Sequence, residues 1–523
     1  MPTGLAEIVC KRFDKAVKRK TNWETLYQEA LCYVAPHRET FYDAEVSVPG
    51  QDKSGKGEVF DSTAIDGVQK FVSNLQSSLV PPMKEWIGLK PGALIKKDQK
   101  MAEGLADVSS ILFSNLQNSN FDTQMSESFY DLAIGTGALL AFKGDVNKPF
   151  RFVNVPLSQL YLEEGPNGIV ETSFRKFKVA GRNIEPTWDD AKISKEMKEK
   201  MSEDEGHEFS LIEATYPDDV EIFNIELNKK EKVKGFRYVV VEKQSKHVLV
   251  EREMRSSPWI VFRWSTLPGE IYGRGPALIA LPDIKTLNKT KELLLKSASM
   301  AILGMYTAVD DGTLNVENIK LAPGAIIPVA ANEGSMQGAT LRRLDAAARP
   351  DLAQIIINDL RASINSQLFA DPLGPVDLPV KTATEMQLRQ AELAKRIGAS
   401  FGRLQFELIQ PLVNRLLDIL DELGLIDLGE YRVDGNIIAI EHVSPLSRAQ
   451  DEEEVMSIFR YMEAIVGMYG PEALHIAAPI EKILKEIGPR LNVPPSIVPT
   501  EEELDERTAE AAQAMGAVQQ QQV

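Results

Sequence analysis

The sequence predicts an α+β protein that is mainly helical and built from several domains. Helical patterns occupy both ends of the 523-residue chain, and short strand patterns gather between residues 138 and 264. Hydrophobic residues make up 43% and charged residues 26%, the composition of an ordinary globular protein. A chain of this length exceeds what one hydrophobic core supports, so we expect more than one domain.

The N-terminal part is expected to be helical. Residues 3–35 predict two helices that meet near Thr21-Asn22-Trp23-Glu24, and Pro36 ends the second. A glycine-rich polar segment, 44–60, predicts an exposed loop. Further helices are expected over residues 61–79, 101–117 and 121–134. The last leads into Gly135-Thr136-Gly137 and the apolar run 138–142.

Short strands and turns follow in the middle of the chain. The clearest strand patterns are residues 152–155, 169–174, 238–241 and 259–264, and a charged helix is expected over 189–205.

A glycine-broken turn at Gly269, Gly273 and Gly275 then runs through Pro276 into a long helical pattern. One side of this helix is apolar, with Ile284, Leu287, Leu294, Ala298 and Ala301. The other side carries Lys285, Lys289, Glu292 and Lys296. Such a helix has a core partner on one face and solvent or a polyanion on the other.

The C-terminal third predicts a second group of helices. Residues 303–348 are a compact mixed stretch rich in Gly and Pro, and 351–369 return to a helical pattern. Three prolines and a glycine exclude helix from 371–379, and Thr382-Ala-Thr-Glu385 is a capping box that opens the next helix. We expect kinks at Gly398, Gly402 and Pro411. A hairpin turn is expected at Val433–Asn436, helix past Pro445, and a disordered tail at Gln519–Gln522.

Charge argues against a tightly binding DNA protein. The chain has 59 basic and 76 acidic residues, a net charge of −17, whereas DNA-binding proteins usually carry the opposite sign. Residues 451–523 hold 14 acidic and 5 basic side chains, a net of −9 that is about half of the total. The first 20 residues are basic instead.

Motifs for catalysis and metal binding are weak. The five histidines have no metal-ligand spacing, and no nucleophile elbow or zinc motif occurs. Gly50–Lys56 resembles a P-loop, but Gly57 replaces the hydroxyl residue that binds magnesium, so a polar loop is favoured over a nucleotide site. The acidic clusters at 451–454 and 501–505 are interpreted as solvated helix starts rather than a two-metal site. We therefore expect no enzyme activity, no cofactor and no metal.

The cysteine content and the lack of a signal sequence predict a protein that folds in a reducing cytoplasm. Only Cys10 and Cys32 are present, too few to staple this chain, and no role is assigned to them. No apolar stretch approaches the length of a membrane span, so no membrane contact is expected.

The order of these elements resembles the phage portal proteins, in particular the head-to-tail connectors of T7-like short-tailed phages. The turn Tyr272-Gly273-Arg274-Gly275 and the helix after it are similar to the entry of the family's first stem helix. The segment Lys381-Thr-Ala-Thr-Glu385 is similar to a family signature, and so is the run from Gly67 to Trp86. The resemblance covers nearly the whole chain, and the order of the motifs carries it.

This resemblance implies a domain plan for a ring-forming portal fold. The wing is expected at 1–275, with a helical N-terminal part and a β-rich part at 138–264. The remaining parts follow in order: first stem helix 276–302, clip 303–348, second stem helix 349–370, tunnel loop 371–382, a long kinked helix and hairpin returning through the wing at 383–443, and a crown with a disordered tail at 444–523.

Two groups of site residues follow from this plan. Asp371, Asp377 and Lys381 are expected on the tunnel loop that narrows a DNA channel, with Lys381 as the phosphate contact; a plain helix–helix connection is the alternative. Lys285, Lys289 and Lys296 form the stem lysine stripe. They face the channel phosphates, the solvent, or Asp351 and Asp359 of a neighbouring subunit, and pairing with Glu292 is a local alternative.

The function that the resemblance implies is that of a conduit. Twelve copies would close into a ring at one capsid vertex of the virion, through which double-stranded DNA passes without sequence-specific contacts. The expected partners are the terminase large subunit, the tail adaptor protein, the major capsid and scaffolding proteins, and internal core proteins as further candidates. Two alternatives stay open: a helical scaffolding or adaptor protein without a channel, and a metal-dependent enzyme acting on nucleic acid.

Overall fold

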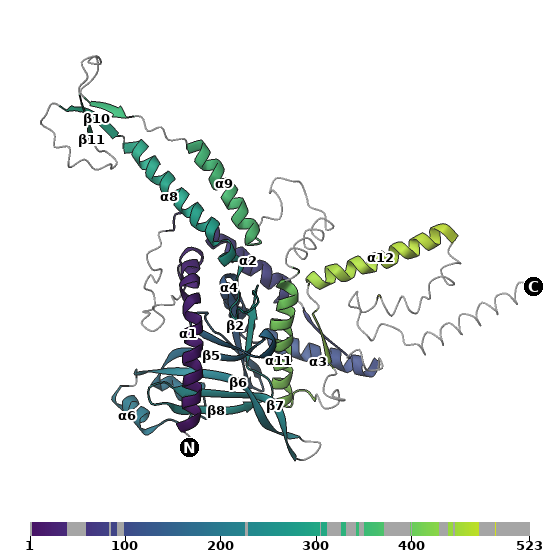
Figure 1. Ribbon diagram of the computed structural model, residues 1–523. Coiled ribbons are helices and arrows are strands. Elements are labelled where there is room, and N and C mark those ends of the chain that lie inside the picture. Colours follow the sequence, from purple (N-terminus) through teal and green to yellow (C-terminus); the bar gives the residue numbers. More distant parts are fainter. Residues whose placement is uncertain are drawn as a thin grey trace, which may run out of the picture.

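The structure, a computed structural model, is an α+β protein whose described residues form two larger and two smaller sheets, with a long helical arm and helices around its base (Figure 1). It describes residues 3–38, 59–82, 85–91, 99–204, 206–224, 229–303, 305–310, 326–330, 341–344, 350–370, 398, 400–427, 438–442, 445–469 and 487. The mixed composition expected from the sequence is therefore confirmed.

Four helices form the N-terminal part: α1 (Thr3–Val34), α2 (Thr63–Leu79), α3 (Gln99–Gln117) and α4 (Phe121–Ile134). The expectation of two helices within residues 3–35 was wrong, because α1 is continuous. No proline or glycine interrupts it near Thr21, and the Thr21 hydroxyl donates to the carbonyl of Val17 one turn earlier (3.1 Å). The buried face also continues through this point, from Ala16 to Tyr27.

A three-stranded antiparallel sheet lies against these helices in the order β3–β2–β9. Its strands are β3 (Lys148–Asn154), β2 (Thr136–Asp145) and β9 (Trp259–Arg263). Residues 136–142 of the central strand are all buried. A strand that reads as a continuous apolar run is covered on both faces, which explains the run 138–142.

A second antiparallel sheet has five strands in the order β4–β5–β6–β7–β8. They are β4 (Leu160–Glu164), β5 (Val170–Ala180), β6 (Glu208–Asn224), β7 (Lys229–Glu242) and β8 (His247–Met254). Short helical pieces connect them: η1 (Pro166–Gly168), η2 (Gly181–Asn183), α5 (Ile184–Thr187) and α6 (Lys195–Glu203).

The helix α6 is shorter than the charged helix expected over 189–205. It begins only after Ser194, whose hydroxyl accepts a hydrogen bond from the Met197 amide (3.3 Å). The preceding residues form a turn in which the Lys192 amide donates to the Leu249 carbonyl on β8 (2.7 Å). Pairing with the sheet therefore competes successfully with helix over residues 189–194.

A long two-helix arm projects from the base (Figure 1). It begins with a short helix, α7 (Pro276–Ile279), continues as α8 (Leu281–Leu303), and returns as α9 (Pro350–Gln367). At its far end are β10 (Met305–Asp310), β11 (Ile326–Ala330) and β12 (Leu341–Leu344), in the order β11–β10–β12. The mixed stretch expected at 303–348 thus contains a small sheet.

The chain then returns to the base as a helix with one irregular turn. Residues 400–404 are α-helical, η4 (Gln405–Ile409) is a π-helical turn, and α11 (Gln410–Glu422) continues to the end. The π-turn lies directly before Pro411, which lacks the N–H of a regular α-helical bond. The departure from regular α-helix thus lies over residues 405–409, whereas Gly402 and Pro411, where kinks were expected, lie in α-helical stretches.

Two further elements complete the described C-terminal part. The strand β13 (Ile438–His442) pairs antiparallel with β1 (Ile87–Pro91), and α12 (Pro445–Tyr469) follows. The hairpin expected around Val433–Asn436 has its turn and its first strand outside the described residues. What the structure places beside β13 is a distant strand, β1.

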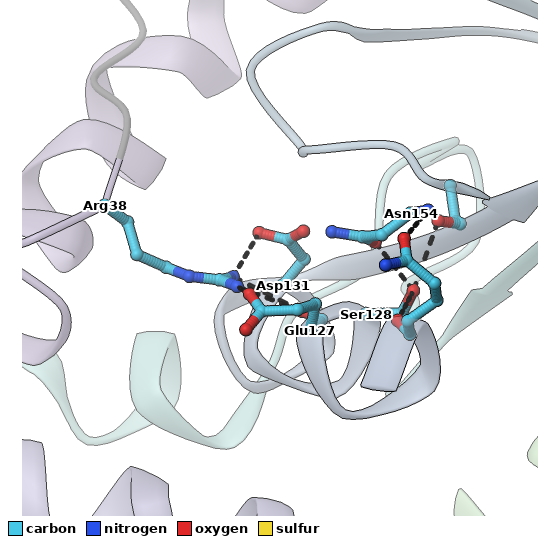
Figure 2. A network of polar contacts seen from close by, with 7 residues as sticks. Arg38, Glu127, Ser128, Asp131 and Asn154 are labelled. Atoms are coloured by element: carbon cyan, nitrogen blue, oxygen red, sulfur yellow. Dashed lines mark hydrogen bonds and ion pairs between the residues drawn. The ribbon is translucent and has the colours of Figure 1, made fainter. Parts of the chain in front are cut away.

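Two buried ionic groups join the layers of the base. Lys20 of α1 donates to the carbonyls of Leu157 (2.7 Å) and Ser158 (2.8 Å), in the connection from β3 to β4. Burial lowers the pKa of Lys20 to about 7. Asp131 of α4 is also fully enclosed, and Arg38 reaches both Asp131 (3.1 Å) and Glu127, as Figure 2 shows. These contacts tie the end of α1 to α4.

Candidate functional site: the root of the helical arm

The glycine-broken turn at the start of the arm is packed backbone against backbone. A Cβ on Gly275 would overlap the Ala133 carbonyl at the end of α4, and one on Gly273 would overlap the Gly135 carbonyl. The Gly275 amide donates to the Ile134 carbonyl (2.9 Å), and the Gly273 amide to Thr136 Oγ1 (2.9 Å). Only glycine permits this approach, so the two glycine-rich turns of the sequence, 135–137 and 273–275, meet here.

Aromatic residues surround the same turn. Tyr27 of α1 donates its hydroxyl to the Gly273 carbonyl (2.6 Å), and the Tyr272 hydroxyl accepts from the Leu162 amide on β4 (3.1 Å). The Trp23 ring stacks on Tyr27 (5.4 Å between centroids), and the Arg274 guanidinium lies over Trp23 (5.1 Å). The turn is therefore held from α1, from α4 and from the larger sheet.

Two carboxylates hold the returning helix α9, one from α8 and one from the base. Asp283 on α8 accepts from Ser363 Oγ (3.1 Å) and Gln367 Nε2 (2.7 Å) across the helix pair. Asp61, before α2, accepts from Arg361 (2.6 Å). Burial raises the pKa of Asp61, but hydrogen bonds from Thr63 and Arg361 outweigh it, and the net pKa is lowered.

The last turn of α9 ends in a strained residue. Phe369 has φ +53°, the left-handed region that a non-glycine residue rarely adopts. The Ala370 amide donates to the Asn365 carbonyl (2.8 Å) and the Phe369 amide to the Ser366 carbonyl (3.2 Å). These are the two backbone bonds of a Schellman motif. The Phe369 ring packs between Trp264 (5.4 Å) and Phe71 (6.4 Å). This aromatic packing offsets the strain, and it fixes the point where the chain leaves α9.

The lysine stripe is paired within the chain. Lys285 Nζ contacts Glu29 Oε1 on α1 (2.5 Å), and this hydrogen bond raises the pKa of Lys285. Lys289 and Lys296 both contact Glu292, at 2.9 and 2.5 Å. The Lys289–Glu292 pair expected from the sequence is confirmed. Pairing of Lys285 with Glu292 was wrong, because residues seven apart lie about two turns apart and Glu29 is closer.

The other predicted site residues fall outside the described part of the chain. These are Asp371, Asp377 and Lys381, the capping box 382–385, the P-loop-like segment 50–56 and the acidic cluster 501–505. The structure does show the described residues that flank the segment 371–397, which we call its anchors. These anchors are Phe369 on the end of α9 and the helix that continues from Ser400 into η4.

The described residues offer structural contacts rather than a constellation for chemistry. Among them, no three His, Cys, Asp or Glu side chains lie close enough together to hold a metal ion. No helix within the described ranges is both long and apolar enough to cross a membrane. Cys10 and Cys32 are half-buried cysteines outside any disulfide, and Cys32 Sγ accepts from Gln28 (3.4 Å).

Several residues of the root were not singled out from the sequence. Tyr27, Glu29, Asp61, Asp283 and Phe369 each contact a residue more than 75 positions away. The one local signal was at Asp61, which precedes a helix and accepts from the Thr63 amide (3.0 Å). The others carry no pattern that a single sequence exposes.

Comparison with known proteins identifies the family. A family described as bacteriophage head to tail connecting protein matches residues 6–498. The portal protein of Salmonella phage epsilon15 is 22% identical over 535 aligned residues, covering 97% of this chain and 92% of that protein. The probable portal protein of Bordetella phage BPP-1 is 20% identical over 480 residues, covering 90% and 84%.

The match spans nearly the entire chain, including the arm and its root. The chain therefore belongs to the bacteriophage head-to-tail connecting protein family, whose members are structural phage proteins. The resemblance identified from the order of motifs is confirmed at this level.

Proposed function

We propose that this head-to-tail connecting protein is the portal of a tailed phage. Copies of it close into a ring at one capsid vertex, DNA passes through the ring during packaging and ejection, and the tail attaches to it. The relatives in phages epsilon15 and BPP-1 support this function because their portal names extend over most of both chains.

The observation that carries ring formation is the apolar surface of the arm. Large apolar side chains on α8 and α9 remain exposed in the single chain: Leu293 (55%), Leu295 (48%), Ile302 (80%), Ile355 (65%) and Ile356 (50%). A helix pair that buries only one face and leaves apolar residues on its others marks an association surface. The neighbouring arm of a second copy offers the same residues.

The domain plan is proposed on the same basis. The wing is residues 1–275, the stem is the helices at 276–302 and 349–370, and the clip is 303–348, which holds the small sheet β11–β10–β12. The tunnel loop is 371–382, residues 383–443 return through the wing, and 444–523 form the crown. The antiparallel arrangement of α8 and α9 supports the two stem assignments.

The mechanism is passage without adhesion. Contacts that neutralise many phosphates release counterions and bind DNA tightly, which would stall it. A chain with net charge −17 has few such contacts to offer. The intrachain partners of Lys285, Lys289 and Lys296 favour a seam or solvent role for the stripe over phosphate contact. On this proposal the tunnel loop that carries Asp371, Asp377 and Lys381 narrows the channel, and Lys381 makes the transient contact with the DNA backbone.

The partners follow from the position at the vertex. The clip faces the terminase and later the tail adaptor, the crown lies inside the capsid, and the basic start of α1 is a candidate contact for shell or scaffold. Assembly takes place in the host cytoplasm, and the product resides in the virion.

Electron microscopy of the purified protein tests ring formation. Closed rings with a central hole about as wide as a DNA duplex are expected. The double variant Leu293→Glu and Ile302→Glu should reduce rings strongly. The matched control Val146→Glu changes an equally exposed apolar residue (59%) on the base and should leave rings intact. Monodisperse monomers under all conditions, including with shell and scaffold proteins, contradict the proposal.

A second experiment tests the tunnel loop. Replacing residues 371–380 with a short Gly-Ser linker should leave rings intact, while DNA packaging or retention fails. Unchanged packaging would remove the loop assignment but not the portal function.

A further inference from the structure

Helix α1 presents a row of cations at the surface of the base. Its four exposed cations lie on one side of the helix at spacings of three or four residues: Lys11, Lys15, Lys18 and Arg19. The two remaining cations of α1 are engaged, because Arg12 binds Glu163 (2.7 Å) and Lys20 is buried against backbone carbonyls. Among the described residues, no ion pair includes any of the exposed four. The exposed side of α1 therefore carries positive charge that the described chain does not neutralise by direct pairing.

The turn between β7 and β8 extends this positive surface. Lys243 lies over the Phe13 ring on α1 (5.9 Å), and Lys246 follows in the same turn. Burial and Asp14 raise the pKa of Cys10 on α1, and the charges of Lys246 and Lys243 oppose that rise. Both lysines of the turn thus lie close enough to α1 to act on its side chains.

Together these residues form a basic face on a strongly acidic chain. We define the basic face by six cations: Lys11, Lys15, Lys18, Arg19, Lys243 and Lys246. The exposed carboxylates of the same stretch of α1 are Glu7 and Asp14, so six cations and two anions leave a net charge of +4, against −17 for the entire chain. Ile8 is also exposed here (56%), three residues before Lys11. Such a surface fits an anionic partner that carries an apolar side chain.

The chain itself contains a segment of that chemistry. Residues 501–506 read Glu-Glu-Glu-Leu-Asp-Glu, five carboxylates and one leucine in six positions. The other acidic cluster, 451–454, lies within α12 and is fixed to that helix. Residues 501–506 therefore match both properties of the basic face, its charge and its lone aliphatic side chain.

The length of chain after α12 allows this segment to reach the basic face. Helix α12 ends at Tyr469, and 31 residues separate it from Glu501. That length spans up to about 100 Å when extended, whereas a compact fold of this size is roughly 60 Å across. Tethering gives the segment an effective concentration on the order of a millimolar, so weak ionic contacts suffice to hold it. An anion that is free in solution, duplex DNA included, lacks this advantage.

We propose that the acidic segment 501–506 docks on the basic face of its own copy, with its carboxylates on the lysines and Leu504 beside Ile8. This inference needs neither the ring nor the channel. The docked segment neutralises a surface that would otherwise hold polyanions. A shell or scaffold protein that contacts the basic start of α1 must then displace the segment.

Zero-length cross-linking identifies the occupant. A carbodiimide joins a lysine amine to a carboxylate that touches it, and trypsin then releases residues 491–507 as one peptide with all five carboxylates. Mixing copies of two isotopic compositions separates links within a copy from links between copies. Links within one copy from this peptide to Lys11, Lys15 or Lys18 support the inference. Links only between copies, or no links from this peptide to the basic face, overturn it.

Charge-neutral variants test the ionic contact through the reactivity of the α1 lysines. The test variant changes three glutamates of the segment: Glu501→Gln, Glu502→Gln and Glu503→Gln. Its matched control changes three exposed glutamates of α6: Glu196→Gln, Glu199→Gln and Glu203→Gln. Acetylation of the α1 lysines by an N-hydroxysuccinimide ester, followed by mass spectrometry, measures how freely they meet solvent.

The expected result is faster acetylation in the test variant alone. A segment docked about two-thirds of the time leaves the lysines free for the remaining third, so its release raises their rates about threefold. In the unmodified protein 1 M salt should also raise the rates, because the Debye length falls to about 3 Å. Equal rates in the test variant and the α6 control overturn the inference. Protection of these lysines that appears only when duplex DNA is added overturns it as well.

Discussion

Asp131 provides a quantitative test of how the base is held together. Its carboxylate lies on α4, where Arg38 binds it (3.1 Å) and the chain encloses it (5% exposed). Burial raises the pKa of Asp131 from 3.8 to about 6, although Arg38 opposes this and Glu127 adds to it. The perturbation is Asp131→Asn, which keeps the shape and removes the ionisation.

The size of the effect follows from the two pKa values. Because its pKa is higher in the folded protein, Asp131 holds its proton more strongly there than in the unfolded chain. Below the unfolded pKa of 3.8 Asp131 is protonated in both states, so its ionisation does not affect stability. As the pH rises from about 4 to about 6, Asp131 ionises in the unfolded chain but stays protonated in the folded protein, and the folded state loses stability. At about 1.36 kcal/mol per pKa unit, the loss is about 3 kcal/mol and stays constant above about pH 6. The Asp131→Asn variant has no such loss.

The assay is urea unfolding of the unassembled protein, followed by tryptophan fluorescence between about pH 4 and pH 8. Relative to the unmodified protein, Asp131→Asn should gain about 3 kcal/mol over this range. Thermal unfolding should show the same trend, with the Tm of Asp131→Asn roughly 3 °C above that of the unmodified protein. Glu127→Gln is the control, because it removes an exposed partner (51%) of the same arginine, for which a change below about 1 kcal/mol is expected. A difference between Asp131→Asn and the unmodified protein that does not vary with pH would refute the argument.

Other predictions concern the root of the arm. Gly275→Ala should cost about 3 kcal/mol or more and impair assembly, because the new Cβ meets backbone that cannot move; thermal unfolding measures this. Gly67→Ala should be nearly neutral, because its Cβ would meet only the flexible end of Leu368 (2.6 Å) and alanine favours the helix; a loss as large as that of Gly275→Ala would contradict this contrast. Arg361→Met should cost about 1–2 kcal/mol at neutral pH. Because the folded pKa of Asp61 is lowered, that cost should shrink as the pH falls through the acidic range, and a pH-independent cost would argue against the ion pair.

Local sequence patterns were enough to predict the positions of several helices. The helices α2, α3, α4 and α9 lie within a few residues of their expected positions, because apolar periodicity and the prolines and glycines at their ends are local signals. The order of the elements also sufficed to identify the family. Periodicity was insufficient in α1, where a weak internal turn signal suggested a break that the continuous buried face excludes.

The sequence by itself determined that glycines at 135–137 and 273–275 interrupt the chain, and that a lysine stripe follows. Only the tertiary structure decided that these two turns meet and that Lys285 pairs with Glu29 on α1. It also decided that α4 seals one edge of the central sheet. The physical reason is the range of the forces. Propensity and periodicity act within a few residues, whereas backbone packing, ion pairs and edge hydrogen bonds depend on where distant elements dock.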